Sequence, residues 1–207
     1  MYIYGIMNKI EDTKRIAAFG PRMAGVFSIS DLKNLFQETD RVRLNRRIAY
    51  LLSIGALSRF ARGFYTISAA SLETLCMRMH EDSYLSLATA LSKHLMIGTV
   101  PAKSAFAVKP GRTRTYSGPI GRLVYAGIQP DLLFGFEYAD GIRYATPEKA
   151  LLDTLYFYQK GRRYYFNIFG DINLSGLNAK VVREFLKRYK NPRFVTFVER
   201  YLDERLS

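Results

Sequence analysis

Histidine, cysteine and tryptophan are scarce in this chain of 207 residues, which holds two His, one Cys and no Trp. A single cysteine, Cys76, excludes a disulfide within the chain and is typical of a reducing compartment. Neither His80 nor His94 has a second His or Cys at metal-ligand spacing, or a Ser or Asp at a recognisable catalytic spacing. The sequence therefore predicts no metal, no cofactor and no catalytic residue, and an enzyme site assembled from distant residues stays as an alternative.

Long apolar runs are also missing. No stretch approaches the roughly 20 apolar residues that a membrane-spanning helix needs. The N-terminal segment MYIYGIMNKIEDTKRI has no charged region followed by an apolar stretch and a small-residue cleavage site, so it does not look like a signal peptide. We therefore expect a cytoplasmic protein without a membrane-spanning segment.

Acidic residues are few: the chain has 18 acidic and 31 basic residues, and its net charge is +13. The excess is present along the whole chain and is densest in its first third. A polyanionic partner is the natural inference. An anionic membrane would be such a partner, but no long helix combines a basic face with exposed apolar residues. Nucleic acid is the polyanion that the sequence favours.

The most informative pattern lies in residues 27–67. Ser30 is the expected N-cap of a first helix, and the short polar segment that ends at Asp40 suits a turn. Thr39 or Asp40 can then cap a second helix, where an acidic cap also complements the positive end of the helix dipole. From Arg41 to Arg62 the chain contains no acidic residue.

The second helix is expected to carry two distinct faces, one apolar and one basic. The apolar face comprises Leu44, Ile48, Leu51 and Leu52, and the basic face comprises Arg43, Arg46, Arg47 and Tyr50. Such a helix can pack on its neighbours and still present guanidinium groups outward. The simpler alternative is a solvated helix whose arginines keep the protein soluble.

Residues 57–67 predict a short hairpin, because apolar and aromatic residues flank Arg62-Gly63 at its tip. A capped helix, a polar turn, a basic helix and a hairpin, in this order, are the pattern of a winged helix-turn-helix, whose second helix enters the major groove of DNA. A winged helix that binds only protein is the alternative. The predicted DNA-binding residues are Arg41, Arg43, Asn45, Arg46, Arg47, Tyr50, Arg59 and Arg62.

We therefore predict an α+β protein with a winged helix-turn-helix domain at 1–69 and a mixed α/β domain at 70–207. Residues 8–19 would supply the first helix of the winged domain. The second domain is expected to contain a small antiparallel sheet and several helices. Its expected elements are a helix at 84–98, a strand around Phe106 and Val108, a hairpin at Asp140-Gly141, a helix capped by Thr146, and helices at 178–189 and 193–206.

Asp153 is unusual because it lies among Leu151, Leu152 and Leu155 in the helix that Thr146 caps. A buried carboxylate without a partner would be costly. We therefore expect Asp153 to be buried and paired with an Arg, Lys or Tyr, and a functional acid is the alternative.

Three segments that follow the winged helix, YLSLATALSKHLMI, KPGRTRTYSGPIGRLVYAGI and LLFGFEYADGIRYATPEKALLD, resemble the AbiEi-type antitoxins of the abortive-infection type IV toxin–antitoxin systems. The most specific match is ATPEKALLD, and GRTR is the next; the resemblance covers nearly the whole chain. It implies a winged helix that binds inverted repeats in the promoter of its own operon and represses it. It also implies a second domain that counters a nucleotidyltransferase-like toxin, directly or indirectly.

The resemblance places the DNA contacts on the basic helix and the hairpin tip, at Arg43, Arg46, Arg47 and Arg62. A monomer in solution would then bind an inverted repeat as two copies. The alternatives are a stand-alone winged-helix transcriptional regulator without a toxin partner, and a pure inhibitor whose winged domain holds a protein. A second-domain basic patch, which would contact DNA or toxin, comprises Lys103, Lys109, Arg112, Arg114 and Arg122, with Arg112 and Arg114 matching the family pattern.

Overall fold

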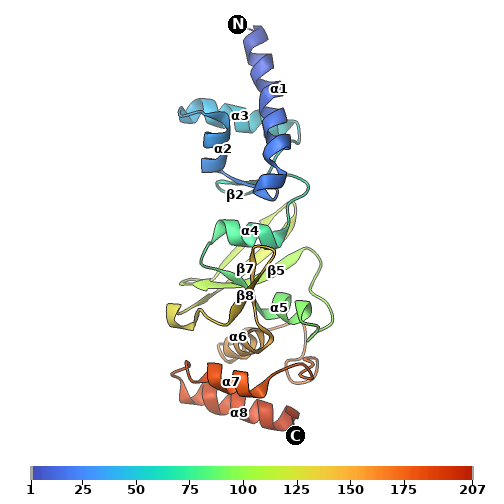
Figure 1. Cartoon of the computed structure of the whole chain (residues 1–207), viewed down its shortest axis with the longest axis vertical. Helices are drawn as coiled ribbons and strands as arrows, with labels where there is room; N and C mark the ends of the chain where they lie inside the picture. Colours follow the sequence, from blue (N-terminus) through green and yellow to red (C-terminus); the bar gives the residue numbers. More distant parts are fainter. Residues whose placement is uncertain (1, 207) are drawn as a thin grey trace. The chain divides into compact units, whose positions relative to one another are not determined.

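The computed structural model describes residues 2–206, and the side chains of residues 9–205. The chain divides into two compact units (Figure 1). Unit 1 holds the residues up to Met79 together with 116–122, and unit 2 holds 80–115 and the residues from Leu123 onward. Unit 1 therefore extends past the predicted boundary between residues 69 and 70. The reason is that the helix at its end, α4, packs against strand β1.

Unit 1 combines α-helices with a small antiparallel sheet of order β1-β3-β2. The predicted hairpin is confirmed as β2 and β3, and the first helix is longer than the predicted 8–19. The apolar face predicted for α3 packs into the core, with Leu52 half-buried. Unit 1 consists of α1 (Tyr2–Phe19), η1 (Pro21–Met23), β1 (Val26–Ser28), α2 (Ile29–Phe36), α3 (Arg41–Ser53), β2 (Ser58–Ala61), β3 (Phe64–Thr66) and α4 (Leu72–Met79). Its core comprises Ile16, Phe27, Leu32, Phe36, Leu44, Ile48, Leu51, Leu57 and Tyr65.

The caps of α2 and α3 set the direction of both helices. Ser28, and not the predicted Ser30, caps α2, because its hydroxyl accepts a hydrogen bond from the Asp31 amide (3.1 Å) while the Asp31 carboxylate accepts one from the Ser28 amide (2.7 Å). This reciprocal capping box satisfies two amides that would otherwise lack partners. Asp40 caps α3 as predicted, accepting from the Arg43 amide at 2.7 Å.

Unit 2 is organised around a six-stranded mixed sheet of order β6-β7-β5-β4-β9-β8. β4 pairs antiparallel with β5 and parallel with β9, where Leu85 lies opposite Tyr144. The sequence predicted a small antiparallel sheet in this domain. The observed sheet has six strands and includes one parallel pair, so it is larger than predicted and mixed. The sheet consists of β4 (Tyr84–Leu85), β5 (Ser104–Pro110), β6 (Arg114–Gly118), β7 (Gly121–Ile128), β8 (Phe136–Ala139) and β9 (Ile142–Ala145). Residues 116–122, which include the end of β6 and the start of β7, are the part of this sheet that groups with unit 1.

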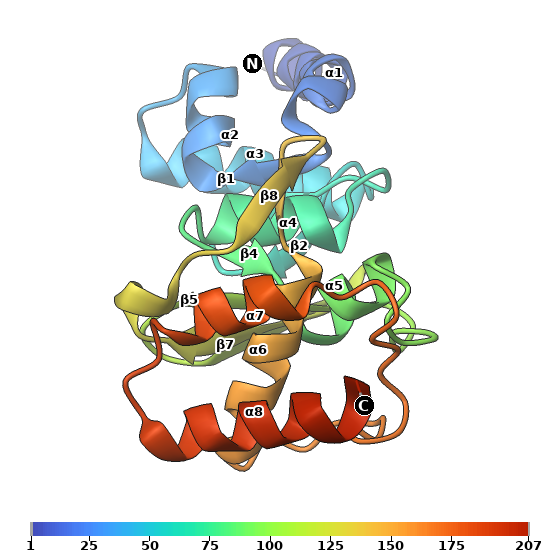
Figure 2. The ribbon, with the colours of Figure 1, turned by 60° about the horizontal axis from the view of Figure 1, so that its bottom comes forward.

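The helices of unit 2 form two layers beside this sheet. α6 (Pro147–Gln159) packs against α5 (Leu87–Lys93) and β9, and on its other side it packs against α7 (Ala179–Leu186) and α8 (Pro192–Leu206). Figure 2 shows α7, α6 and α8 from the end of this stack. The helix predicted at 84–98 is shorter, because Tyr84 and Leu85 belong to the sheet and α5 ends at Lys93.

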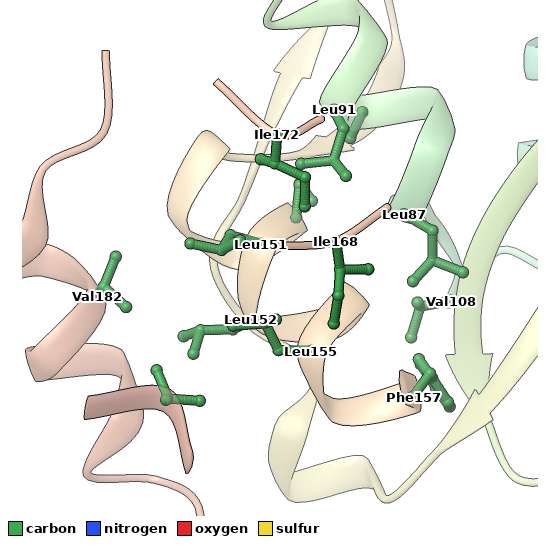
Figure 3. Close-up of a cluster of buried hydrophobic side chains, with 14 of the residues drawn as sticks. Leu87, Leu91, Val108, Leu151, Leu152, Leu155, Phe157, Ile168, Ile172 and Val182 are labelled. Atoms are coloured by element: carbon green, nitrogen blue, oxygen red, sulfur yellow. The ribbon is translucent and has the colours of Figure 1, made fainter. Parts of the chain in front are cut away.

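The core of unit 2 is built on both faces of α6. Figure 3 shows Leu152 facing Val182 of α7 on one side, while Leu87 of α5 and Val108 of β5 lie on the other. All four side chains are fully buried. Burying a Leu or Val side chain contributes about 1.5–3 kcal/mol, so α6 is the main apolar link between the sheet and the outer helices.

Candidate nucleic-acid interface

Helix α3 leaves a wide polar face open to solvent. Leu44, Ile48 and Leu51 are buried, and the residues at the other helical positions of its first three turns are largely exposed. The exposed fraction of Val42 is 58%. The exposed positions on this face are Arg41, Val42, Arg43, Asn45, Arg46 and Ala49.

The exposed arginines of α3 form no ion pair with a carboxylate of the described residues. Among the described residues, no ion pair involves the side chain of Arg41, Arg43 or Arg46. Their guanidinium groups therefore keep their donors for a partner, and each can bridge two acceptors in one plane. Of the predicted contact residues on α3, Arg41, Arg43, Asn45 and Arg46 meet the requirement of exposure.

Arg47 does not lie free on the basic face of α3, where the sequence predicted it. Its Nε donates to Asp12 Oδ2 at 2.8 Å, and a second guanidinium nitrogen donates to the other oxygen of the same carboxylate. Nη1 donates to the carbonyl oxygen of Phe36 at 3.2 Å and lies 3.7 Å from the Glu38 carboxylate. The hydrogen bond with Asp12 is the main reason that the pKa of Arg47 is raised. Arg47 thus ties α3 to α1 and to the end of α2, and its guanidinium is already engaged within unit 1 through Nε and both terminal nitrogens.

Two further predicted residues, Tyr50 and Arg59, contact other side chains of unit 1. Tyr50 is half-buried against the core, and the Nζ of Lys9 lies 4.6 Å from its ring centre. Arg59 of β2 is exposed, but its guanidinium lies 5.7 Å from the centre of the Tyr65 ring and donates to the Tyr65 hydroxyl at 3.3 Å. Tyr65 therefore restricts where Arg59 can reach.

Arg62 lies at the exposed turn between β2 and β3. The next residue, Gly63, has φ of 81°, a left-handed conformation that glycine adopts without strain. The hairpin therefore turns tightly and leaves the guanidinium at its tip, as the pattern predicted.

The second-domain basic patch is only partly formed. Lys103, Arg112 and Arg114 are exposed in unit 2. Lys109 is 9% exposed and its Nζ donates to the carbonyl oxygen of Pro110 at 3.0 Å, so it is not a surface cation. Arg122 is exposed but belongs to unit 1. The surface patch of unit 2 therefore reduces to three residues of the predicted five.

The GRTR segment that carries Arg112 and Arg114 is fixed against β7. The amide of Gly111 donates to the Ile128 carbonyl oxygen at 3.0 Å, and the amide of Gly127 donates to the Thr113 hydroxyl at 3.0 Å. A Cβ atom on Gly127 would lie 1.9 Å from the Gly111 oxygen, so only glycine fits there. The loop is thus held in a defined conformation, with both arginines pointing away from the core.

Asp153 is buried and fully partnered, as the sequence predicted. Its carboxylate accepts from the Tyr84 hydroxyl (2.9 Å), the Ser86 hydroxyl (2.8 Å) and the Lys149 ammonium (2.7 Å). Lys149 also donates to the Tyr189 hydroxyl at 3.0 Å, and the side chains of Lys149 and Asp153 are both 0% exposed. Burial lowers the pKa of Lys149, Asp153 opposes this effect, and the charge of Arg188 adds to it.

This network, which we call the Asp153 network, therefore has the character of a structural ion pair. Burial and the neighbouring carboxylate raise the pKa of Tyr84 well above its usual value, so its phenol is a donor at neutral pH. Lys149 was not predicted as the partner of Asp153, although its spacing of four from Asp153 on one helix is the usual spacing of an ion pair.

Comparisons with known proteins support the fold alone. No model of a known protein family matches the sequence, and a search of curated proteins found no match. The structure is similar to the crystal structure of the RV2827C protein from Mycobacterium tuberculosis, with a TM-score of 0.51 and 15% sequence identity over 92% of this chain and 70% of that one. Within residues 2–206, no helix is long and apolar enough to cross a membrane, and no group of acidic, His and Cys side chains could hold a metal ion.

Proposed function

We propose that unit 1 is a winged helix-turn-helix that binds double-stranded promoter DNA. In this proposal α2 and α3 are the helix-turn-helix pair, α3 is the recognition helix, and the β2–β3 hairpin is the wing. The observation that carries the proposal is the exposed face of α3, where Arg41, Arg43 and Arg46 project without carboxylate partners among the described residues.

The residue types on α3 suit the edges of base pairs in a major groove. Arginine at positions 43 and 46 can bond two acceptors of guanine, and Asn45 can bond adenine in the same bidentate way. The exposed methyl groups of Val42 suit the methyl group of thymine. Arg41 at the start of α3 and Arg62 at the hairpin tip are placed for phosphates, whose neutralisation releases counterions. One chain would read one half-site, so an inverted repeat would take two copies.

We further propose that the protein is a cytoplasmic AbiEi-type antitoxin that represses its own operon. The resemblance of unit 2 to that family supports this proposal, most specifically through residues 145–153. In this proposal unit 2 counters a nucleotidyltransferase-like toxin, directly or indirectly, and is not an enzyme. The exposed cations Lys103, Arg112 and Arg114 are its candidates for a contact with toxin or DNA.

Arg46→Ala is expected to weaken binding to a promoter fragment by roughly tenfold or more, because Arg46 has no structural partner to lose and only an outward contact. An unchanged slope of log affinity against log salt concentration would assign Arg46 to a base, and a fall of about 0.9 would assign it to a phosphate. Titration of the labelled fragment at several salt concentrations measures both quantities.

Arg200→Ala is the matched control, since Arg200 is exposed on α8 and its loss removes the same charge from unit 2. This variant should bind the fragment as the unmodified protein does. If Arg46→Ala and Arg200→Ala bind equally well, the exposed face of α3 is not the DNA-binding surface.

The antitoxin proposal is tested with the full chain and the product of the neighbouring gene. That product should arrest growth when expressed alone, and co-expression of this chain should restore growth. The double variant Arg43→Ala/Arg46→Ala should release a promoter reporter from repression and still restore growth, because the altered residues lie on the DNA-binding face of unit 1. A neighbouring product without effect on growth would leave the stand-alone regulator as the better description.

A further inference from the structure

Unit 2 contains a pocket of about 360 Å³ where the end of α6 meets η2 (Pro130–Leu132) and the connection between α7 and α8. Its polar wall is formed by Lys160, Arg188, Lys190 and Asn191, and its aromatic wall by Tyr156 and Tyr189. All of these residues belong to unit 2, so the pocket is independent of the proposed DNA-binding face.

Positive charge dominates the pocket, because three cations line it against the single carboxylate of Asp131. Lys190 lies 3.5 Å from Asp131, but both side chains are mostly exposed, so this ion pair is weak. Among the described residues, neither Lys160 nor Arg188 forms an ion pair with a carboxylate. Two of the three cations are therefore free to meet an anion.

Aromatic rings hold these two cations in place. The Nζ of Lys160 lies 4.3 Å from the centre of the Tyr156 ring, and the guanidinium of Arg188 lies 4.4 Å from the centre of the Phe134 ring. Such contacts orient a cation without neutralising its charge. The side chains need little reordering to bind a ligand, which lowers the cost of binding.

The base of the pocket is rigid. Tyr189 is only 5% exposed, and its hydroxyl accepts a hydrogen bond from Lys149 in the Asp153 network. At the rim, Asn191 accepts a hydrogen bond from the Arg193 amide in the first turn of α8, so the positive end of that helix adds to the field of the cations.

We propose that this pocket binds the phosphate groups of a small molecule of the size of a nucleoside diphosphate. Its volume lies at the lower end of the range of small-molecule sites. An arginine that can bond two phosphate oxygens, beside two lysines that act as point charges, is a typical set of phosphate ligands. The concave shape favours a compact ligand over the extended backbone of a nucleic acid.

Calorimetric titration of the full chain with pyrophosphate and with ADP, at physiological ionic strength, tests the proposal. Both probes should bind with a Kd below about 1 mM, and Arg188→Ala and Lys160→Gln should each weaken binding by about tenfold or more, because each removes a charge-assisted hydrogen bond. The matched controls Arg200→Ala and Lys180→Ala, exposed cations of unit 2 that do not line the pocket, should bind as the unmodified chain does.

Circular dichroism and thermal unfolding verify that each variant is folded. If Arg188→Ala does not fold, Lys160→Gln alone still tests the proposal. Absence of binding by the unmodified chain would overturn the proposal, as would equal losses in the pocket and control variants. A single-stranded oligonucleotide that binds with the same sensitivity to Arg188 and Lys160, while pyrophosphate does not bind, would also overturn it and assign the site to nucleic acid.

Discussion

Asp153→Ala is expected to lower the free energy of unfolding by about 3–5 kcal/mol, because it leaves the ammonium group of Lys149 buried without its carboxylate. The hydroxyl groups of Tyr84 and Ser86 would lose their acceptor in the same change. This loss is a large part of the total stability of a typical domain. Urea denaturation followed by circular dichroism measures it.

A double-mutant cycle distinguishes the ion pair from simple loss of packing. Lys149→Met and Asp153→Leu should each cost a similar amount, since each leaves the other charge buried and unpaired, whereas Lys149→Met/Asp153→Leu should recover much of the loss. Additive costs in the double variant would contradict the pairing. If Asp153→Asn stays folded and still counters the toxin, the alternative of a functional acid at this position is excluded.

Arg47→Ala is expected to destabilise unit 1 by about 2–3 kcal/mol, because it removes both hydrogen bonds to Asp12, whose side chain is 2% exposed. Arg46→Ala, one position earlier, should change stability by no more than about 0.5 kcal/mol, since its side chain faces solvent. Thermal unfolding of the two variants measures this contrast.

In DNA binding the same two variants should show the opposite contrast, with the larger effect from Arg46→Ala. At a temperature where both are folded, Arg47→Ala should keep the affinity and the salt dependence of the unmodified protein, and Arg46→Ala should bind about tenfold more weakly. A reduced salt slope in folded Arg47→Ala would show that the ion pair with Asp12 opens on DNA and that the original prediction for Arg47 is right.

The sequence predicted those features that depend on residues close together along the chain. The caps at Asp40, Thr146 and Asn178 each accept a hydrogen bond from an amide two or three positions later, so a local pattern suffices to find them. The two faces of α3 follow from helical spacing in the same way. Local spacing also places Arg62 at the tip of the hairpin.

Features that depend on distant partners were missed. Arg43, Arg46 and Arg47 share one arc of α3, and what distinguishes Arg47 is its contact with distant residues, above all Asp12, 35 positions away. The parallel pairing of β4 with β9 joins Leu85 to Tyr144, and no periodicity within either segment reveals that partner. Pairings of this kind are decided by tertiary packing.

The run of basic residues in the second domain also predicted the surface only in part. Five basic residues in a segment without acidic residues predicted one surface patch, yet the alternation along β5 turns Lys109 inward. A run of basic residues along the sequence does not indicate on which face of a strand each side chain lies. The alternation of Ala105, Ala107 and Lys109 along β5 was the available signal.

The Asp153 network has a consequence for shortened versions of unit 2. Its members come from β4, the residue before α5, α6 and the connection after α7, so they span the chain from Tyr84 to Tyr189. A fragment that stops before Tyr189 would remove one acceptor of the Lys149 ammonium and also the α8 residues that cover this core, among them Phe194 and Val198. Deletion from the C-terminus therefore removes a partner of the network together with the buried side chains of α8, so a library of truncated proteins should yield no soluble product that ends before Tyr189.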